Sequence, residues 1–436
     1  MAPVRPGPAS RLAPARLAAL LALARAASAS LRVLPRLNIV GSVTVSGISS
    51  GADLAAQFHV ANSDIVGGSA IMAGQAYGCA IMRFDGEPQV PCSAVPSGPG
   101  CAGMPWGPAP CVGCDAGMTV AYDHCKQQPN LTASAGAVGK LVAYAQAAEA
   151  AGDIPPLAGL ARASVFLFRG TLDNTYKDGT VNATQATFAA LGVPRANMRF
   201  VADVPAGHCW PTADAAVPAS SCGGGKGGPP AMENCGFDGA GAALQQLYGD
   251  GALSPPQNLS AFDPANLLMF YQFHYSQDTP WAGQGKQGWL YEPLRCQQGH
   301  ACTLHVALHG CGMSASNPAM GMSFVLHTGL NAWADANDIA VLYPQQGGFI
   351  DFNLTAPTAQ LGGACFDGYG QTGVDYAQFT SPQMLAIRNM IAALRGGNAA
   401  AGSVTPRRRG GAAEELPEHP ACAAHPEACR RSPRRA

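Results

Sequence analysis

Ser49 lies in a sequence context that a nucleophilic serine requires. The pentapeptide GISSG at 47–51 follows a β-favouring run at 43–45 and precedes a helix-like segment that extends to residue 62. A strand, G-x-S-x-G and a helix in this order form a nucleophile elbow, which exposes the serine hydroxyl at a sharp turn. The pentapeptide alone is weak evidence, because the chain contains 53 glycines. Its flanks strengthen the interpretation, since a helix N-terminus stabilises negative charge that develops nearby.

An aspartate and a histidine follow two further predicted strands. Asp173 comes just after the apolar run 163–170, and His208 follows the run 198–204. The carboxyl ends of parallel strands share one edge of a sheet, where sites are usually built. Each residue also has an ordinary structural explanation. An aspartate after a strand is often a cap or turn residue, Asp178 is a nearby alternative for the acid, and a loop histidine often only hydrogen-bonds its own loop.

Ser49, Asp173 and His208 have the residue types and the chain order of the triad in α/β-hydrolases. In that chemistry, His208 would take the proton from Ser49 and return it to the leaving group. Asp173 would orient the imidazole and stabilise its cation, while backbone N–H groups would hold the oxyanion. We therefore predict a catalytic triad at the edge of a sheet.

A His-Gly-Cys sequence at 309–311 ends a later predicted strand at 303–309. In ordinary α/β-hydrolases a His-Gly loop precedes the nucleophile elbow and supplies one N–H group to the oxyanion hole. Here it follows the whole triad, so we infer a circular permutation that moved the front half of the fold to the back. Domain termini often lie close together, which lets a permutation preserve the sheet. The expected oxyanion donors are the N–H groups of Ser50 and Cys311.

The chain alternates predicted strands and helices, which indicates an α/β fold with a mainly parallel sheet flanked by helices. The pattern predicts strands at 65–74, 163–170, 198–204, 286–293, 303–309 and 339–343, and helices at 136–151, 180–191, 323–337 and 381–394. We expect a single catalytic domain at 31–395 with a Cys-rich insertion at about 75–135. The segment 396–436 is rich in Gly, Ala, Pro and Arg, which predicts a disordered basic tail.

Residues 1–30 have the pattern of a secretory signal peptide, with arginines before a short apolar run and small residues after it. The stretch also fits an organellar transit peptide, because it is rich in arginine and lacks acidic residues. Fifteen cysteines are many for a cytosolic enzyme. The N-x-S/T sequons, which are candidate glycosylation sites, are at Asn130, Asn182, Asn258 and Asn353. We expect a secreted protein, with an organelle lumen as the alternative.

The overall composition gives no sign of nucleic acid or membrane function. The chain of 436 residues is 47% hydrophobic and 12% charged, and its formal net charge is −1. A large core is therefore possible, and no excess of positive charge favours nucleic acid as a partner. The N-terminal apolar run is too short to span a bilayer comfortably. We expect no membrane span and a monomer.

Together, the motifs resemble the circularly permuted polyhydroxybutyrate (PHB) depolymerases, those of the fungal secreted type and their bacterial relatives. The likeness spans about residues 40–395. The motifs that carry it are VSGISSG with Ser49, GTLD with Asp173, AGHCWPT with His208, VALHGC with Cys311, YPQQ at 343–346 and ACFDGYGQTGVDYA at 364–377. Their order excludes the unpermuted feruloyl and acetylxylan esterases, which share an HGC-type loop. The resemblance implies a serine esterase that cuts polyesters of 3-hydroxybutyrate, with no metal or other cofactor.

The chain departs from the family after Cys365, where the family carries Trp-rich sequence. Here the residues are Phe366, Asp367, Gly368 and Tyr369. Loss of the indoles weakens the inference to crystalline polymer but not to ester hydrolysis. The candidate substrate-binding residues are His309, Trp210, Phe366 and Tyr369.

Cysteine spacing suggests disulfide pairs but does not determine their connectivity. The candidate pairs are Cys79–Cys125, Cys222–Cys235, Cys296–Cys302 and, following the resemblance, Cys311–Cys365, which would tie the oxyanion loop to the substrate loop. Cys209 is the expected unpaired cysteine. The C-x-x-C at 111–114 has neither a second C-x-x-C nor a thioredoxin-type setting, so we assign it no redox or zinc role.

The leading hypothesis is a secreted serine esterase that hydrolyses poly(3-hydroxybutyrate) or its oligomers through an acyl-enzyme on Ser49. The expected partner is thus a polyester or oligoester substrate. One alternative is a general carboxylesterase that acts on small or polysaccharide-linked esters. Another is a non-catalytic binding protein on a hydrolase scaffold, since fold does not fix function.

Overall fold

The structure, a computed structural model, describes residues 33–79, 125–126, 131, 136–224, 231–276, 284–347, 364–368 and 376–397. Several sequence-based predictions lie outside the described residues. They concern the leader at 1–30, nearly all of the tail at 396–436, most of the insertion at 75–135, the C-x-x-C at 111–114, Asn130, Asn353 and Tyr369.

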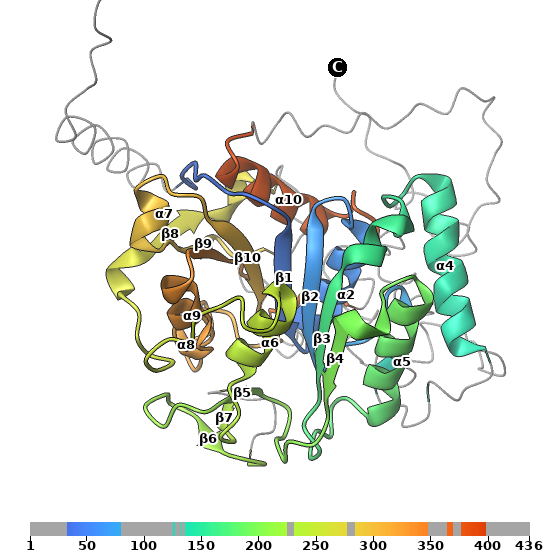
Figure 1. Ribbon diagram of the computed structural model, residues 1–436, viewed down its shortest axis with the longest axis horizontal. Coiled ribbons are helices and arrows are strands. Elements are labelled where there is room, and N and C mark those ends of the chain that lie inside the picture. The colour runs from blue at the N-terminus through green and yellow to red at the C-terminus, as the bar shows by residue number, and fades with distance from the viewer. Residues whose placement is uncertain are drawn as a thin grey trace, which may run out of the picture.

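A sheet of eight strands forms the centre of the fold, and β9 runs opposite to the other strands (Figure 1). The strands follow the order β4 (Met198–Val201), β3 (Ser164–Phe168), β2 (Val66–Met72), β1 (Val43–Ile48), β10 (Thr303–Leu308), β11 (Ile339–Tyr343), β9 (Gln287–Tyr291) and β8 (Leu267–Tyr271). The mainly parallel sheet predicted from the sequence is confirmed.

The two halves of this sheet come from different halves of the chain and join at β1 and β10. These strands pair in parallel, with Gly47 opposite Leu308, and Figure 1 shows them side by side near the middle of the sheet. The nucleophile elbow follows β1, and the His-Gly-Cys loop follows β10. The topology is the circularly permuted α/β-hydrolase fold that the motif order predicts, and it places these two loops next to each other.

Helices cover both faces of the sheet. They are α2 (Ser50–Ala61), α4 (Ala137–Ala151), α5 (Asp178–Ala190), α6 (Gly239–Tyr248), α7 (Leu294–Gln297), α8 (Ser323–His327), α9 (Leu330–Ala336) and α10 (Pro382–Leu394). Alternate strand residues face opposite sides. In β3, Val165 and Leu167 pack in the core that includes α2, α5 and α10, while Phe166 and Phe168 pack in the core that includes α6, α8 and α9. Each such side chain contributes about 1.5–3 kcal/mol when fully buried.

The first and last described segments lie against each other. The N–H of Leu37 donates to the carbonyl of Leu394, at the end of α10, over 2.8 Å. Arg395 donates from Nη2 to the carbonyl of Gly41 over 2.6 Å. This proximity of the two segments is what a permuted chain requires, because the ancestral connection would have to join them.

Three parts of the fold differ from the sequence-based prediction. The helix predicted at 323–337 is split into α8 and α9, because Gly329 adopts a φ of 85° at the N-terminus of α9. The sequence pattern also missed β8 and α6. A small sheet with the order β5-β7-β6 lies in the Gly- and Pro-rich stretch after His208. Its strands are β5 (Trp210–Thr212), β6 (Ser220–Ser221) and β7 (Met232–Asn234).

No helix in the described part of the chain is both long and apolar enough to cross a membrane.

Two buried histidines bridge elements of the core. His305 on β10 places Nδ1 2.8 Å from Thr44 Oγ1 and Nε2 2.7 Å from Ser46 Oγ. His59 on α2 places Nδ1 2.7 Å from Ser69 Oγ. Burial lowers the pKa of His305 and that of His59 to about 3. Both side chains are therefore neutral in the folded protein at neutral pH.

Acid should destabilise the fold through these histidines. Unfolded imidazoles bind a proton near pH 6.5, whereas the buried ones resist protonation down to a pKa of about 3. The contribution of each histidine to the free energy of unfolding is therefore fully present above pH ~6.5. It falls as the pH drops, by about 1.4 kcal/mol per pH unit for each histidine. Urea unfolding at several pH values measures this slope. His305→Gln should reduce it by about 1.4 kcal/mol per pH unit, and an unchanged slope in the variant would contradict the assignment.

Candidate active site

The turn between β1 and α2 holds Ser49 in a strained conformation. Ser49 has φ 57° and ψ −126°, which L-residues rarely adopt. Such strain persists only where the surroundings impose it, and it is common at functional sites. A side chain at Gly47 would collide with the backbone of Gly51, and one at Gly51 would collide with the carbonyls of Leu308 and His309. The two glycines of the motif therefore make this tight turn possible.

Asp173 and His208 contact each other beyond the ends of β3 and β4. His208 Nδ1 lies 2.9 Å from Asp173 Oδ2, and the side chains are only 6% and 1% exposed. The two loops are tied together by the N–H of Leu172, which donates to the carbonyl of Ala206 over 3.0 Å. Gly170 allows this approach, because a Cβ there would collide with the Ala206 backbone.

The surroundings of Asp173 favour its ionised form. Its Oδ1 accepts the N–H groups of Thr175 and Tyr176 at 2.7 and 3.0 Å, while Oδ2 faces His208. Burial by itself raises the pKa of Asp173, but the interactions with His208 and with the two N–H groups outweigh it, so that the pKa lies below its ordinary value. A carboxylate here holds the neutral imidazole proton on Nδ1 and leaves Nε2 available as a base.

Asp178 does not take this place. Its side chain is 66% exposed and forms an ion pair with Arg169. Arg169 also donates to the backbone carbonyls of Asp173 and Tyr176 at 2.9 and 2.8 Å. The guanidinium thus braces the turn that carries Asp173, and the carboxylate beside His208 is that of Asp173.

The His-Gly-Cys loop packs against the elbow. A Cβ on Gly310 would lie 3.2 Å from the carbonyl oxygen of Ile48. Ser50 is the first residue of α2, so its N–H has no acceptor within the helix. Cys311 is linked to Cys365 by a disulfide, which fixes the loop from the other side. An anion would be stabilised in this position by the positive end of α2.

Two curated proteins are similar to this chain over most of its length. A poly(3-hydroxybutyrate) depolymerase of Delftia acidovorans is 32% identical over 382 residues, which are 86% of this chain and 63% of that protein. A polyhydroxybutyrate depolymerase of Talaromyces funiculosus is 29% identical over 375 residues, which are 84% of this chain and 93% of that protein. No family model matches the chain.

Two solved structures share its fold. One is a serine-to-alanine variant of a PHB depolymerase complexed with an R3HB trimer, with a TM-score of 0.64 and 28% identity. The other is the PHB depolymerase from Penicillium funiculosum, with a TM-score of 0.63 and 27% identity. Each comparison covers 84% of this chain and 99% of the other. In both sequence and fold, the chain is therefore similar to PHB depolymerases over most of its length.

His309 has a different place from the one we expected. It is buried, Nδ1 lies 2.7 Å from the carbonyl oxygen of Gly310, and Nε2 accepts the N–H of Gln346 over 3.0 Å. Burial lowers the pKa of His309 to about 4, so the ring is neutral at neutral pH. Both nitrogens are thus used inside the protein, and His309 holds the His-Gly-Cys loop instead of offering a group to substrate.

Trp210 and Phe366 also differ from the expectation that they bind substrate. Both side chains are fully buried. Trp210 donates from Nε1 to the carbonyl of Thr328 over 2.9 Å, and the ring of Phe366 lies 4.8 Å from that of His309. Their closeness in sequence to His208 and Cys365 suggested a crevice position, but side chains without accessible surface cannot contact a ligand.

The described residues contain four disulfides, which are the four candidate pairs. They are Cys79–Cys125, Cys222–Cys235, Cys296–Cys302 and Cys311–Cys365. Cys209 is a free, buried cysteine, as expected. Burial and the charge of Glu233 raise the pKa of its thiol well above the ordinary value, so little reactive thiolate forms. Among the described residues, Cys222, Glu233 and Cys235 bring metal-ligand types together. Because the two sulfurs are joined, we assign no metal there.

Two supporting residues, Glu233 and Tyr176, were not predicted from the sequence. Glu233 is buried and accepts the N–H groups of Gly207 and Gly223 at 2.9 and 2.6 Å, which fixes the loop before His208. The ring of Tyr176 is stacked on that of His208. A lone glutamate or tyrosine forms no recognisable motif, so only the fold reveals these contacts.

Asp173→Asn should lower kcat on a short p-nitrophenyl ester by about 10³–10⁴-fold, because the neutral amide no longer fixes the proton on His208 Nδ1. Steady-state kinetics measure the loss. Asp178→Asn is the matched control, since it makes the same chemical change on an exposed carboxylate nearby. Its activity should stay within about threefold of the wild type, and a large loss confined to Asp178→Asn would reassign the acid.

Removal of the Cys311–Cys365 disulfide should lower kcat by at least about tenfold, since one oxyanion donor contributes about 10²–10³-fold and its loop would become mobile. The double variant Cys311→Ala/Cys365→Ala tests this on the same ester. Cys296→Ala/Cys302→Ala removes a bridge beside α7, before β10, and should change only stability. Equal kcat in both double variants would show that the His-Gly-Cys loop does not need its disulfide for catalysis.

Proposed function

We propose that the chain is a serine esterase that hydrolyses poly(3-hydroxybutyrate) or its oligomers through an acyl-enzyme on Ser49. The observation that carries the proposal is the buried Asp173–His208 pair, 2.9 Å between Nδ1 and Oδ2, on the sheet edge that also carries the strained Ser49 elbow. The curated relatives from Delftia acidovorans and Talaromyces funiculosus are named as depolymerases of this polyester.

In the acylation step, His208 Nε2 accepts the proton of the Ser49 hydroxyl while Oγ attacks the ester carbonyl carbon. The carbonyl oxygen becomes an oxyanion, which the N–H groups of Ser50 and Cys311 hold at the N-terminus of α2. The tetrahedral intermediate then breaks its bond to the alcohol oxygen. This oxygen takes the proton from His208 and leaves as a hydroxyl-terminated chain, while the acyl group stays on Ser49.

In the deacylation step, water repeats the sequence. His208 takes a proton from the water, whose oxygen attacks the acyl carbon. The second tetrahedral intermediate expels Ser49 Oγ, which recovers its proton from His208. The product is a free carboxylic acid. Asp173 remains ionised throughout and stabilises the imidazolium that forms in each half-reaction. These steps need no metal ion and no other cofactor.

The proposed substrate class rests on the PHB depolymerases to which the chain is similar. The solved relative complexed with an R3HB trimer is 28% identical, and the similarity covers 99% of that chain. A trimer is a short piece of the polyester, so a matching site in this chain would accept an internal ester bond with an acyl unit on one side and a hydroxyl unit on the other.

Secretion and a single catalytic domain at 31–395 belong to the same proposal. Four disulfides among the described residues fit an oxidising compartment. Asn182 and Asn258, in two of the sequons, are exposed and thus accessible to glycosylation. A mature extracellular enzyme would meet a polymer that cannot enter a cell.

A small-ester carboxylesterase is the second candidate, and one observation favours it. Trp210 and Phe366 are buried, so these two candidate crevice residues give no aromatic surface on which a polymer chain would lie. A small soluble ester needs less of such a surface.

The deciding experiment measures soluble 3-hydroxybutyrate products released from amorphous poly(3-hydroxybutyrate) by the wild type and by Ser49→Ala. A short p-nitrophenyl ester is tested in parallel, and an organophosphonate is used to label the nucleophile. We expect release from polymer, a covalent adduct on Ser49, and a loss of at least about 10⁴-fold in Ser49→Ala. Cleavage of the small ester alone would support the carboxylesterase. Absence of both the adduct and the activity would support a binding protein.

A further inference from the structure

Tyr176 lies flat against the imidazole of His208. The two ring centroids are 5.4 Å apart and the planes differ by 10°. The hydrogen bond to Asp173 fixes the Nδ1 end of the imidazole, but by itself it leaves the plane of the ring free to turn. A stacked aromatic ring removes that freedom and thereby aims Nε2. Catalytic groups need this kind of support, because their own rotamers must be locked by the residues behind them.

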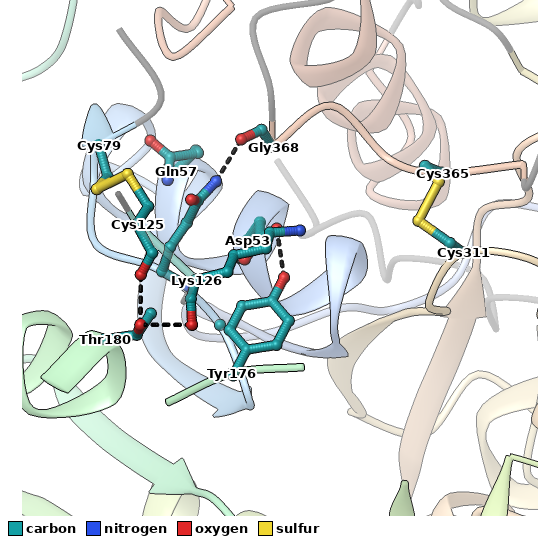
Figure 2. A network of polar contacts seen from close by, with 12 residues as sticks. Asp53, Gln57, Cys79, Cys125, Lys126, Tyr176, Thr180, Cys311, Cys365 and Gly368 are labelled. Atoms are coloured by element: carbon teal, nitrogen blue, oxygen red, sulfur yellow. Dashed lines mark hydrogen bonds and ion pairs between the residues drawn. A yellow bond between two sulfur atoms is a disulfide. The ribbon is translucent and has the colours of Figure 1, made fainter. Parts of the chain in front are cut away.

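Tyr176 is itself held at both ends. Its N–H donates to Asp173 Oδ1 over 3.0 Å, and its carbonyl accepts from Arg169 Nε over 2.8 Å. Its hydroxyl donates to Asp53 Oδ2 over 2.7 Å, as Figure 2 shows. Because the side chain is fully buried, it does not reach a substrate, and its contacts are with groups of the protein.

Asp53 links this tyrosine to the helix of the nucleophile. It lies in the first turn of α2 and its N–H donates to the carbonyl of Ser49 over 2.8 Å. The carboxylate is fully buried, and such a charge is very costly unless it is paired. Lys126 Nζ lies 3.1 Å from Oδ2, and the N–H of Gln75 donates to Oδ1 over 2.9 Å. Burial raises the pKa of Asp53, and the positive charge of Lys126 opposes that rise.

Lys126 is brought to this position by its backbone. Its carbonyl accepts the N–H of Lys177 over 2.8 Å and the hydroxyl of Thr180 over 3.1 Å. The preceding residue, Cys125, is joined to Cys79 by a disulfide, which Figure 2 shows beside the ion pair. Lys126 therefore brings a positive charge to the buried carboxylate of Asp53.

We propose that Tyr176 is a positioning residue for His208, locked in place by the buried Asp53–Lys126 ion pair. The inference rests on the proposed function, which it deepens: Tyr176 sets the plane of the general base, and Asp53 joins that base to the elbow helix. It also gives Lys126 a role in the chemistry, although this residue lies away from the triad in the sequence.

The test compares Tyr176→Leu, which removes the ring, with Tyr176→Phe, which keeps it. On a short p-nitrophenyl ester, kcat of Tyr176→Leu should fall by about 30–100-fold, since a small displacement of a catalytic group has effects of that order. KM should change by less than about twofold, because Tyr176 does not reach substrate. Tyr176→Phe keeps the ring but loses the hydrogen bond to Asp53, so its kcat should fall by about three- to tenfold, between the wild type and Tyr176→Leu. Tyr144→Leu, which removes from α4 a tilted ring contact with Tyr77, is the control for a merely structural effect and should lower the Tm without lowering kcat.

The role of the ion pair is tested by removing the charge of Lys126 alone and then the charges of both partners. Lys126→Met leaves an unpaired buried carboxylate and should lower kcat by about tenfold or more. Adding Asp53→Asn removes the charge but keeps an acceptor for the tyrosine hydroxyl, so the double variant should recover to within about threefold of the wild type. A double variant that remains as slow as Lys126→Met would overturn the role of the pair.

Ser49→Ala, assayed beside these variants, separates the two levels of inference. If Ser49→Ala is inactive while Tyr176→Leu is as fast as the wild type, or while Tyr176→Phe loses as much as Tyr176→Leu, only the positioning role is wrong. If Ser49→Ala keeps full activity, both are wrong. Should Tyr176→Leu fail to fold, Tyr176→Met replaces it with the same expectation. Should that fail too, a loss of 30-fold or more in the well-folded Tyr176→Phe, on the scale expected for a displaced base, would overturn the proposal, and a loss of about three- to tenfold would support it.

Discussion

The parallel pairing of β1 with β10 is the constraint on which the site depends. Their register puts Gly47 opposite Leu308, so the elbow and the His-Gly-Cys loop leave the sheet side by side. The fit is close enough that Gly51 has no room for a side chain beside the carbonyls of Leu308 and His309. Backbone hydrogen bonds between strands depend on neighbourhood in space and not on chain order. The permutation could therefore move half of the sheet along the sequence without moving it in space.

Around this junction, three buried carboxylates hold the neighbouring loops in place. Asp173 accepts two N–H groups and faces His208, Glu233 accepts the N–H groups of two glycines in neighbouring loops, and Asp53 receives Lys126 and a tyrosine hydroxyl. A buried carboxylate is destabilising unless such donors surround it. Each one therefore holds its loop in a single arrangement, and in combination they make a site that is ordered before substrate arrives.

The sequence predicted well those features that depend on local pattern. The strand–turn–helix around Ser49 and the positions of Asp173 and His208 after strands follow from short motifs and apolar runs, and the order of the motifs predicted the permuted topology. Contacts between segments far apart in the chain were harder to predict from the sequence. Trp210 and Phe366 look like crevice residues because of their neighbours in sequence, yet whether a side chain points to solvent or to the core depends on what packs above it. Tyr176 and Asp53 are 123 positions apart in the chain, and neither local sequence predicts that they are in contact.

The meeting of the N-terminal segment with the end of α10 has a mechanical consequence. Leu37 and Leu394 are joined by a backbone hydrogen bond, and Arg395 reaches back to Gly41. A force applied between these two segments would load this contact together with the backbone hydrogen bonds of Asn38 and Val40 to Cys302, just before β10. A protein tethered to a bead or a solid support through only one of the two segments bears no force across this contact, so its sheet and its nucleophile elbow stay unloaded.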